Sequence, residues 1–303
     1  MIFRLLIIFF LFTSFQLLPK SPFIVVLGIT QDAGYPQIGC DKECCKKYWD
    51  KKIAKQKVSC LALFDPATNQ KWIFDATPDL TEQLHDADVL QKGNLSGIFL
   101  THAHIGHHTG LMYLGREALN TKEVPVYAMP RMHDYIKNNG LWSQLISLNN
   151  IKLQKLKADS SIKLTDKISV TPILVPHRDE FSETVGYSIK TEKKTLLFIP
   201  DIDKWQKWDR DIRQMVKSHD DLFIDGTFYK DGELPGRNMS EVPHPFVQES
   251  MELFKDLTST EKQKIWFIHF NHTNPLIDKS SKEYKEVKSR GFNIAIEGSR
   301  ITL

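Results

Sequence analysis

The sequence predicts an α/β protein with one folded domain, because short apolar, β-branched runs alternate with turns and a few amphipathic segments along most of its 303 residues. No internal repeat, low-complexity tract or flexible linker divides the chain. Hydrophobic residues make up 41% and charged residues 25%, an ordinary balance for a protein with a large core. The net charge of +3 is small and the basic residues are spread along the chain, so no nucleic-acid partner is expected.

The first twenty residues differ in composition from the rest. A short basic start at residues 1–4 precedes an almost wholly apolar run at residues 5–18, which is typical of a secretory signal and too short for a comfortable transmembrane span. We therefore expect residues 1–20 to be a signal peptide or an N-terminal anchor, and residues 21–303 to form the domain. The protein would be periplasmic or extracellular, and would contact the membrane only if this segment stayed uncleaved.

Twelve runs have the length and composition of β-strands. They span residues 23–30, 59–65, 71–75, 97–102, 124–129, 151–156, 168–176, 185–190, 195–200, 222–225, 264–269 and 292–296.

Helical periodicity is rarer than strand periodicity. It is clearest over residues 108–120, and it recurs over residues 205–217, 245–257 and 279–289. Thr77 before Pro78 also predicts a helix start, with threonine as the N-cap and proline at the first helical position.

Four histidines occupy the seven positions from 102 to 108, directly after an apolar run that predicts a buried strand. A single histidine is more often a surface or core residue than a ligand, but four at this spacing indicate metal binding. His102 and His104 are separated by one residue, so both can turn toward one ion at the end of the strand. His107 follows where the turn into a helix could direct it to a second ion. The segment therefore predicts a metal site for one or two ions.

Several of the expected strands end in a residue that can bind metal. These residues are Asp75, His102, His177, Asp201, Asp225 and His269. Residues at one edge of a sheet converge, so we expect a shared site. Aspartate often begins the turn after a strand, which is the alternative explanation for any one of the aspartates.

The four cysteines are Cys40, Cys44, Cys45 and Cys60. An even number in an exported protein suggests disulfides, but the adjacent Cys44 and Cys45 form a poor geometric pair. Three thiols within six positions need only one more ligand to complete a tetrahedral structural zinc site. A disulfide between Cys60 and one of the other three is the alternative.

Taken together, these residues resemble the signature of the metallo-β-lactamase superfamily. That signature is His-x-His-x-Asp-His, followed at long intervals by a histidine, an aspartate and a final histidine, each at a strand end. The matching positions are His102, His104, His107, His177, Asp201 and His269. The resemblance implies an αββα sandwich, in which two mixed β-sheets pack face to face with helices outside and metal ions at one edge.

One position departs from the signature. Gly106 stands where the superfamily has the aspartate that normally binds the second metal ion. The resemblance then implies that His102, His104 and His177 hold one ion and that His107 and His269 hold the other, with Asp201 bridging. A weakened second site is expected, which Gly106→Asp should strengthen. His108 is expected behind the ligands or exposed at the start of a helix.

Three passages resemble, within the superfamily, the pyrroloquinoline quinone biosynthesis protein B group and the phosphodiesterases of the phosphonate-degradation pathway. They are residues 28–40, 225–233 and 269–275, which read GITQDAGYPQIGC, DGTFYKDGE and HFNHTNP. In such relatives a cysteine loop and a histidine near the last active-site ligand hold a structural zinc. The resemblance thus implies a zinc site formed by Cys40, Cys44, Cys45 and His272.

We expect metal-dependent hydrolysis of an ester or phosphodiester in a small-molecule substrate. One or two zinc ions are expected in the active site, with iron or manganese as alternatives, and one structural zinc at the cysteines. The candidate catalytic residues are Asp201, His107 and His244, and Asp225 lies in a loop that could also face the substrate.

Two other functions stay open. One is an oxidative role with iron, like that of the quinone-biosynthesis group, although export argues against a step in cytoplasmic cofactor synthesis. The other is metal binding without turnover, which only Gly106 favours. The sequence makes no prediction of oligomeric state.

Overall fold

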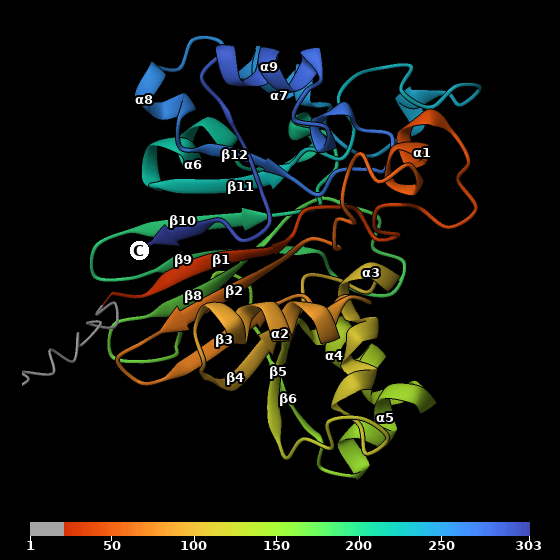
Figure 1. The fold of residues 1–303 in the computed structure, drawn as a ribbon. Coiled ribbons are helices and arrows are strands. Elements are labelled where there is room, and N and C mark those ends of the chain that lie inside the picture. The colour runs from red at the N-terminus through yellow and green to blue at the C-terminus, as the bar shows by residue number, and fades with distance from the viewer. Residues whose placement is uncertain (1–20) are drawn as a thin grey trace, which may run out of the picture.

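The computed structural model describes residues 21–303, and the expected signal peptide or anchor at residues 1–20 lies outside the described residues. Two seven-stranded sheets pack face to face, and helices cover the outer side of each (Figure 1). The αββα sandwich implied by the resemblance is confirmed.

The first sheet has the order β14-β1-β2-β3-β4-β5-β6. Its strands are β1 (Phe23–Gly28), β2 (Cys60–Asp65), β3 (Gln70–Phe74), β4 (Asn94–Phe99), β5 (Val124–Ala128), β6 (Ile151–Lys155) and β14 (Arg300–Thr302).

The second sheet has the order β13-β12-β11-β10-β9-β8-β7. Its strands are β7 (Ile162–Lys163), β8 (Ser169–Leu174), β9 (Val185–Lys190), β10 (Thr195–Ile199), β11 (Asp221–Asp225), β12 (Ile265–Ile268) and β13 (Asn293–Ile294).

Helices α2, α4 and α5 lie outside the first sheet, α6 to α9 lie on the side of the second sheet, and α1 and α3 lie at one end of the sandwich (Figure 1). The α-helices are α1 (Glu43–Trp49), α2 (Leu80–Leu90), α3 (Ile105–His108), α4 (Pro130–Asn138), α5 (Gly140–Ser147), α6 (Ile212–Ser218), α7 (Val247–Leu253), α8 (Ser259–Lys262) and α9 (Lys282–Ser289). The 3-10 helices are η1 (Thr109–Leu114), η2 (Trp205–Lys207), η3 (Met239–Glu241) and η4 (Pro275–Ile277).

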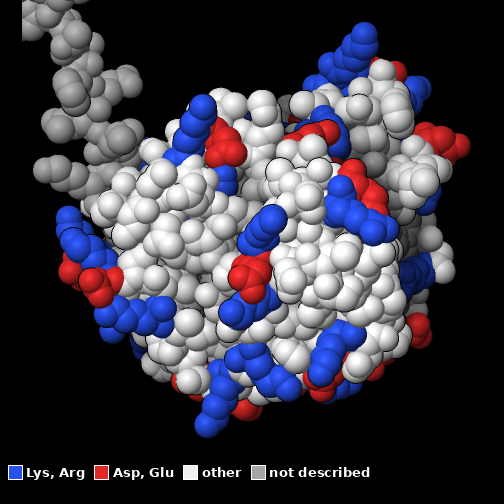
Figure 2. All heavy atoms as spheres, turned by 90° about the horizontal axis from the view of Figure 1, so that it is seen from below, with Lys and Arg blue, Asp and Glu red and all other residues white. Residues whose placement is uncertain are grey.

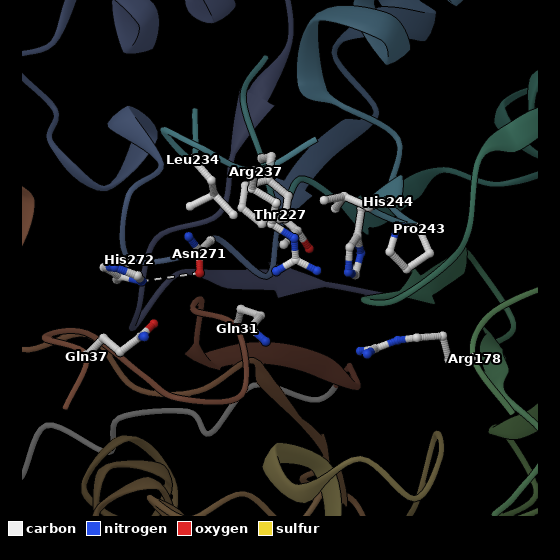
Figure 3. Close-up of a pocket in the computed structure, with 12 residues that line it drawn as sticks. Gln31, Gln37, Arg178, Thr227, Leu234, Arg237, Pro243, His244, Asn271 and His272 are labelled. Atoms are coloured by element: carbon white, nitrogen blue, oxygen red, sulfur yellow. Dashed lines mark hydrogen bonds between the residues drawn. The ribbon is translucent and has the colours of Figure 1, made fainter. Parts of the chain in front are cut away.

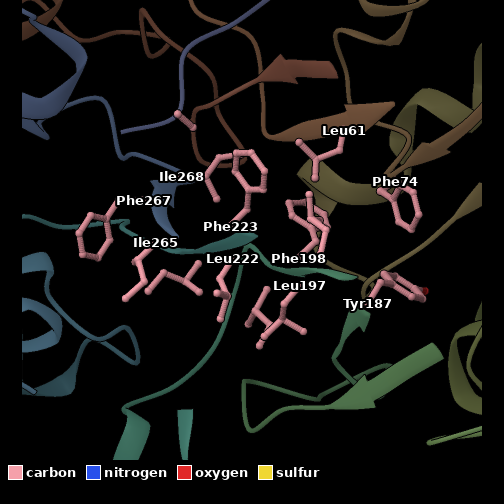
Figure 4. Packing of buried hydrophobic residues seen from close by; sticks show 14 of the residues in the cluster. Leu61, Phe74, Tyr187, Leu197, Phe198, Leu222, Phe223, Ile265, Phe267 and Ile268 are labelled. Carbon is pink, nitrogen blue, oxygen red and sulfur yellow. The ribbon is translucent and has the colours of Figure 1, made fainter. Parts of the chain in front are cut away.

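One part of the core lies between the sheets and continues beneath α6, α7 and α9, and another lies beneath the helices of the first sheet. Strand β1 is buried along its whole length, with Ile24 facing the layer between the sheets and Phe23 facing the helices. Between the sheets, the ring of Phe74 on β3 meets Tyr187 on β9 edge-on at 5.4 Å between centroids (Figure 4). Such contacts hold the two sheets in a fixed relation.

Strand direction brings the carboxyl ends of many strands to a common edge. In the first sheet β1, β3 and β4 run parallel to one another, and in the second sheet β8, β10, β11 and β12 do the same. The residues that follow these strands therefore gather at one end of the sandwich, where α3 begins.

The prediction of a helix over residues 108–120 is wrong. The chain forms α3 up to His108 and then only the 3-10 helix η1 up to Leu114. The amide of Gly110 donates to the carbonyl of Ala76 (2.9 Å), outside the helix, so the regular hydrogen-bond ladder is interrupted.

Other helix boundaries also differ from expectation. The segment 205–217 is divided into η2 and α6, and α6 starts anew because the side chain of Asp211 accepts a hydrogen bond from the amide of Arg213. The hydroxyl of Thr77 accepts from the amide of Asp79 (3.1 Å), as an N-cap does, but helix α2 begins only at Leu80 and not at Pro78. Within residues 21–303, no helix is both long and apolar enough to cross a membrane. Figure 2 shows a face on which Lys and Arg are interspersed with Asp and Glu.

Candidate metal centre

A first cluster of potential ligands forms where β4, β8 and β10 end. It consists of His102, His104, His177 and Asp201, whose ligand atoms all lie within 4.8 Å of one another. Nε2 of His102 lies 2.8 Å from Nδ1 of His104, and Nε2 of His177 lies 3.3 Å from Oδ1 of Asp201. The structure thus brings together the four residues that the sequence analysis assigned to one ion and its bridging carboxylate.

A second cluster shares Asp201 and contains Asp32, His107 and His269, again with ligand atoms within 4.8 Å. Oδ2 of Asp201 lies 3.4 Å from Nε2 of both His107 and His269. Asp201 therefore stands between the two clusters, with one oxygen toward His177 and the other toward the second cluster. Asp32 was not predicted, and it lies in the loop after β1.

Hydrogen bonds fix the ring orientation of the ligands from the first sheet. Nδ1 of His107 donates to Asp75 (2.7 Å), which directs Nε2 into the cluster. Asp75 also accepts from the amide and the hydroxyl of Thr101, and that hydroxyl in turn accepts from Nδ1 of His102 (2.9 Å). One buried carboxylate therefore orients two candidate ligands.

A second relay orients His269. Its Nδ1 donates to the hydroxyl of Thr227 (2.9 Å), which donates to Asp225 (2.7 Å). His269 and Asp75 both have φ of 69°, in the left-handed region that side chains rarely adopt. Such strained backbone concentrates at functional sites, where the surrounding contacts hold it in place.

Burial and charge set the protonation of the ligands. Burial lowers the pKa of His102 well below its usual value and that of His177 to about 4, so both rings are neutral at pH 7 and can bind metal. Burial alone would raise the pKa of Asp201, but the histidines around it hold that pKa well below its usual value. Burial would also lower the pKa of His107. The carboxylates of Asp75, Asp201 and Asp32 outweigh burial and hold that pKa well above its usual value, so the surroundings of this ring favour a positive charge.

The clusters contain buried polar atoms that make no hydrogen bond within residues 21–303. They are Oδ1 of Asp32, Nε2 of His107, both ring nitrogens of His177, Oδ1 of Asp201 and Nε2 of His269. An unmade buried hydrogen bond costs about 1–3 kcal/mol, so several together at one point need a common partner. Imidazole nitrogens with carboxylate oxygens are a donor set that suits zinc, and the residues present fit a divalent metal ion in each cluster.

His244 and Asp225 lie beside the first cluster. Nδ1 of His244 is 2.8 Å from Asp225 and 3.3 Å from Oδ1 of Asp201. Asp225 is fully buried and also accepts from the amides of Ile202 and Thr227, so it organises the core of the site and does not face the substrate. His108 lies behind the ligands, where its ring packs against Tyr135 and Trp142.

A cavity of about 360 Å³ opens beside His244. Figure 3 shows Arg237 and His244 projecting into it from one side, with Arg178 and Gln31 on the opposite side. Two guanidinium groups therefore border the opening next to the metal clusters.

The structure also brings Cys40, Cys44, Cys45 and His272 together, with ligand atoms within 4.8 Å of one another. Sγ of Cys40 lies 3.8 Å from Sγ of Cys44, and all four cysteines of the chain are free. The alternative disulfide with Cys60 is therefore absent from the described structure. Cys60 is buried on β2, away from this cluster.

The family model of the β-lactamase superfamily domain matches residues 71–270, about two thirds of the chain. The chain belongs to the metallo-β-lactamase superfamily. Coenzyme PQQ synthesis protein B of Methylococcus capsulatus is 25% identical over 92% of this chain and 99% of the relative.

Two solved structures share the metallo-β-lactamase fold. Zinc-bound PqqB from Methylobacterium extorquens has a TM-score of 0.78 and 22% identity, and the match covers 93% of this chain and all of the other. A diphosphatase from the PhnP family has a TM-score of 0.66 and 19% identity, with 93% and 97% covered.

Asp32 is the residue of this superfamily site that the sequence analysis missed. It follows β1 by four positions and has no histidine cluster beside it, whereas Asp201 follows β10 by two positions and His269 follows β12 directly. The available signal was its place within the passage 28–40, next to a sheet edge already expected to hold metal.

Proposed function

We propose that this protein is a metal-dependent hydrolase of anionic esters, with phosphodiesters as the substrate class. The observation that carries the proposal is the placement of Arg178 and Arg237 around the cavity that adjoins the metal clusters. Guanidinium groups bind phosphate oxygens with two parallel hydrogen bonds, so this opening favours a phosphate-containing substrate over a neutral one.

A bound divalent ion would supply a water of lowered pKa, about 7, and would polarise the ester bond under attack. Asp201 orients the two clusters relative to each other, because its oxygens face His177 on one side and His107 on the other. Asp75 and Thr227 keep the ligand rings from rotating. The chain thus supplies a fixed arrangement that needs little reorganisation during the reaction.

His244 is suited to protonate the leaving group. Burial lowers its pKa, but the carboxylates of Asp225 and Asp201 outweigh burial and raise that pKa above its usual value. With Nδ1 bound to Asp225, the proton on Nε2 is available on the cavity side. In hydrolysis, the water oxygen bonds to phosphorus and the bond to the leaving oxygen breaks. That oxygen takes the proton of His244, and the proton of water passes to solvent, from which His244 is protonated again.

The proposal is tested with the zinc-loaded protein and three substrates: bis(p-nitrophenyl) phosphate, the neutral ester p-nitrophenyl acetate, and a chromogenic lactam. We expect turnover of the phosphodiester in preference to the other two, and its loss on treatment with a chelator. Faster hydrolysis of the neutral ester or the lactam would contradict the assignment of substrate class.

An oxidative role is the second candidate, because similarity to coenzyme PQQ synthesis protein B extends over 92% of the chain. Two histidines and a carboxylate suit ferrous iron, and the second cluster offers two histidines and two carboxylates. Iron-dependent oxygen consumption by protein that does not hydrolyse phosphodiesters would favour this role. The experiment compares oxygen uptake by iron-loaded and zinc-loaded protein.

We also propose that residues 1–20 direct export. Periplasmic or secreted material whose mature chain starts near residue 21, as measured by intact mass, is the expected result. Full-length protein in the cytoplasm would contradict it.

A further inference from the structure

The place where the superfamily has its aspartate is sterically closed in this chain. Gly106 lies in α3, and a Cβ atom there would lie 2.4 Å from Cα and 2.8 Å from Oδ1 of Asp32. Real Cβ atoms essentially never make contacts this short, and the closest atom belongs to the backbone of residue 32. The loop after β1 can therefore reach the site only because residue 106 is a glycine and has no Cβ atom.

Asp32 brings a carboxylate to the same side of the second cluster. Its Oδ1 lies 2.9 Å from Nε2 of His107 and 3.7 Å from Nε2 of His269. The side chain is only 16% exposed, and Oδ1 makes no hydrogen bond within residues 21–303. These are the distances that ligand atoms of one shared cation have from one another.

The loop that carries Asp32 is fixed to both sheets. The amide of Gln31 donates to the carbonyl of Phe270 (2.9 Å), one residue after His269, and the hydroxyl of Thr30 donates to the carbonyl of Lys57 (2.8 Å). Gly34 closes a turn with its amide on the carbonyl of Gln31 (2.8 Å) and a φ of 71°. Asp32 therefore has a position set by the backbone on both sides.

We propose that Asp32 is the carboxylate ligand of the second metal ion, and that it replaces the aspartate lost at position 106. The carboxylate comes from the loop after β1 instead of from α3. The second site then has a complete set of ligands in Asp32, His107, Asp201 and His269. Gly106→Asp would not strengthen the site, because the added side chain would displace Asp32. The inference rests on the metal centre proposed above, but on neither the substrate nor the reaction.

The test counts metal ions in the whole domain. After equilibration with zinc and removal of free metal, wild-type protein should hold three zinc ions, two in the active site and one at the cysteines. Asp32→Asn keeps the size of the side chain but removes its charge, and it should lose one of the three or bind it at least tenfold more weakly. Asp209→Asn, at an exposed position, is the matched control and should keep all three.

Gly106→Ala tests the steric half of the proposal without removing any ligand. The added methyl group should push Asp32 away, and the protein should then lose the second active-site ion, as Asp32→Asn does. Gly140→Ala is the control, because a Cβ there has no atom within 4 Å. Retention of both active-site ions with wild-type affinity by Asp32→Asn or by Gly106→Ala would overturn the proposal, as would wild-type protein that binds a single active-site ion.

A measurement on wild-type protein does not depend on the folding of any variant. In crystals grown with zinc, anomalous scattering should place the second ion about 2.0–2.2 Å from an oxygen of Asp32. An ion bound by His107 and His269 with Asp32 turned away would refute the assignment. Because the ion count and the crystal do not use turnover, they stay informative even if phosphodiester hydrolysis fails.

Discussion

Asp75 and His107 form a fully buried pair, in which Oδ2 of Asp75 lies 2.7 Å from Nδ1 of His107. Asp75 makes no contact with the cavity, yet it fixes the ring that enters the second cluster and, through Thr101, the ring of His102. Asp75→Asn should weaken binding of the active-site ions by about 10–100-fold. Zinc titration against a competing chelator measures this, with Asp209→Asn at an exposed position as the control. Unchanged affinity would show that the ring orientation is fixed by packing alone.

Loss of a first-cluster ligand should be more severe. His177→Ala removes one of three imidazoles around the first ion, and we expect at least a hundredfold fall in phosphodiester hydrolysis together with loss of one zinc ion. His85→Ala, at an exposed position in α2, should change neither quantity. Undiminished activity in His177→Ala or His102→Ala would rule out this cluster as the active site.

The two arginines should affect substrate binding more than the chemical step. Arg178→Ala and Arg237→Ala should each raise KM for a phosphodiester by about tenfold, since one charge-assisted contact contributes about 1.5 kcal/mol. The neutral ester should respond much less. Arg116→Ala is the control, because Arg116 is exposed and pairs with its exposed neighbour Glu117. Equal effects on charged and neutral substrates would argue against a phosphate contact.

The cysteine cluster should act on stability and not on turnover. Cys44→Ser should release one zinc ion and lower the melting temperature, while the active-site ions and kcat change little. The site connects α1 to the segment after β12, which the ion pair of Lys47 and Asp278 (2.7 Å) also joins. Cys60→Ala should keep the full zinc count. Loss of active-site zinc in Cys44→Ser would mean that the two sites are coupled.

Glu233 should make stability depend on pH. Burial raises its pKa to about 7 in the folded protein, against about 4.3 in an unfolded chain. The folded state then holds a proton that the unfolded state lacks, so the free energy of unfolding falls as pH rises from about 4.3 to about 7. Glu233→Gln has a side chain that is uncharged at every pH. We expect its free energy of unfolding to exceed that of wild type by about 1–2 kcal/mol at pH 8.

The same advantage should shrink toward pH 5, where wild-type Glu233 is protonated in the folded state. Urea unfolding of the zinc-loaded protein across this range measures the difference. Glu192→Gln, at an exposed position, is the control. A difference that does not change with pH would contradict the raised pKa.

The sequence predicted the strands well because burial leaves a direct record in composition. All twelve expected runs overlap observed strands, whereas the short β7 and β14 carry too few residues to show a period. Short helices were harder: α4 and α5 were not predicted, and Gly110 interrupts the helix expected after His107, because its amide bonds to a distant carbonyl. Local periodicity holds no information about such a partner.

In the metal centre, too, some residues could be predicted from the sequence and one could not. His102 and His104 could be found because four histidines fall within seven positions, and His177, Asp201 and His269 because each follows a strand within three residues. Asp32 could not be found, because its role depends on the close approach of the loop after β1 to Gly106 in α3, which is 74 positions farther along the chain. The absence of a side chain at Gly106 looked like a lost ligand when considered alone, and the structure shows that another loop occupies that space.

The two sheets contribute equal numbers of candidate ligands to each cluster. The first cluster takes His102 and His104 from the first sheet, and His177 and Asp201 from the second, while the second cluster takes Asp32 and His107, and Asp201 and His269. All of the first-sheet ligands precede the connection at residues 156–161, and all of the second-sheet ligands follow it. A chain cut at this connection would therefore yield two fragments that each carry half of the candidate ligands. Zinc should then favour association of the two fragments, because neither can surround the ion alone.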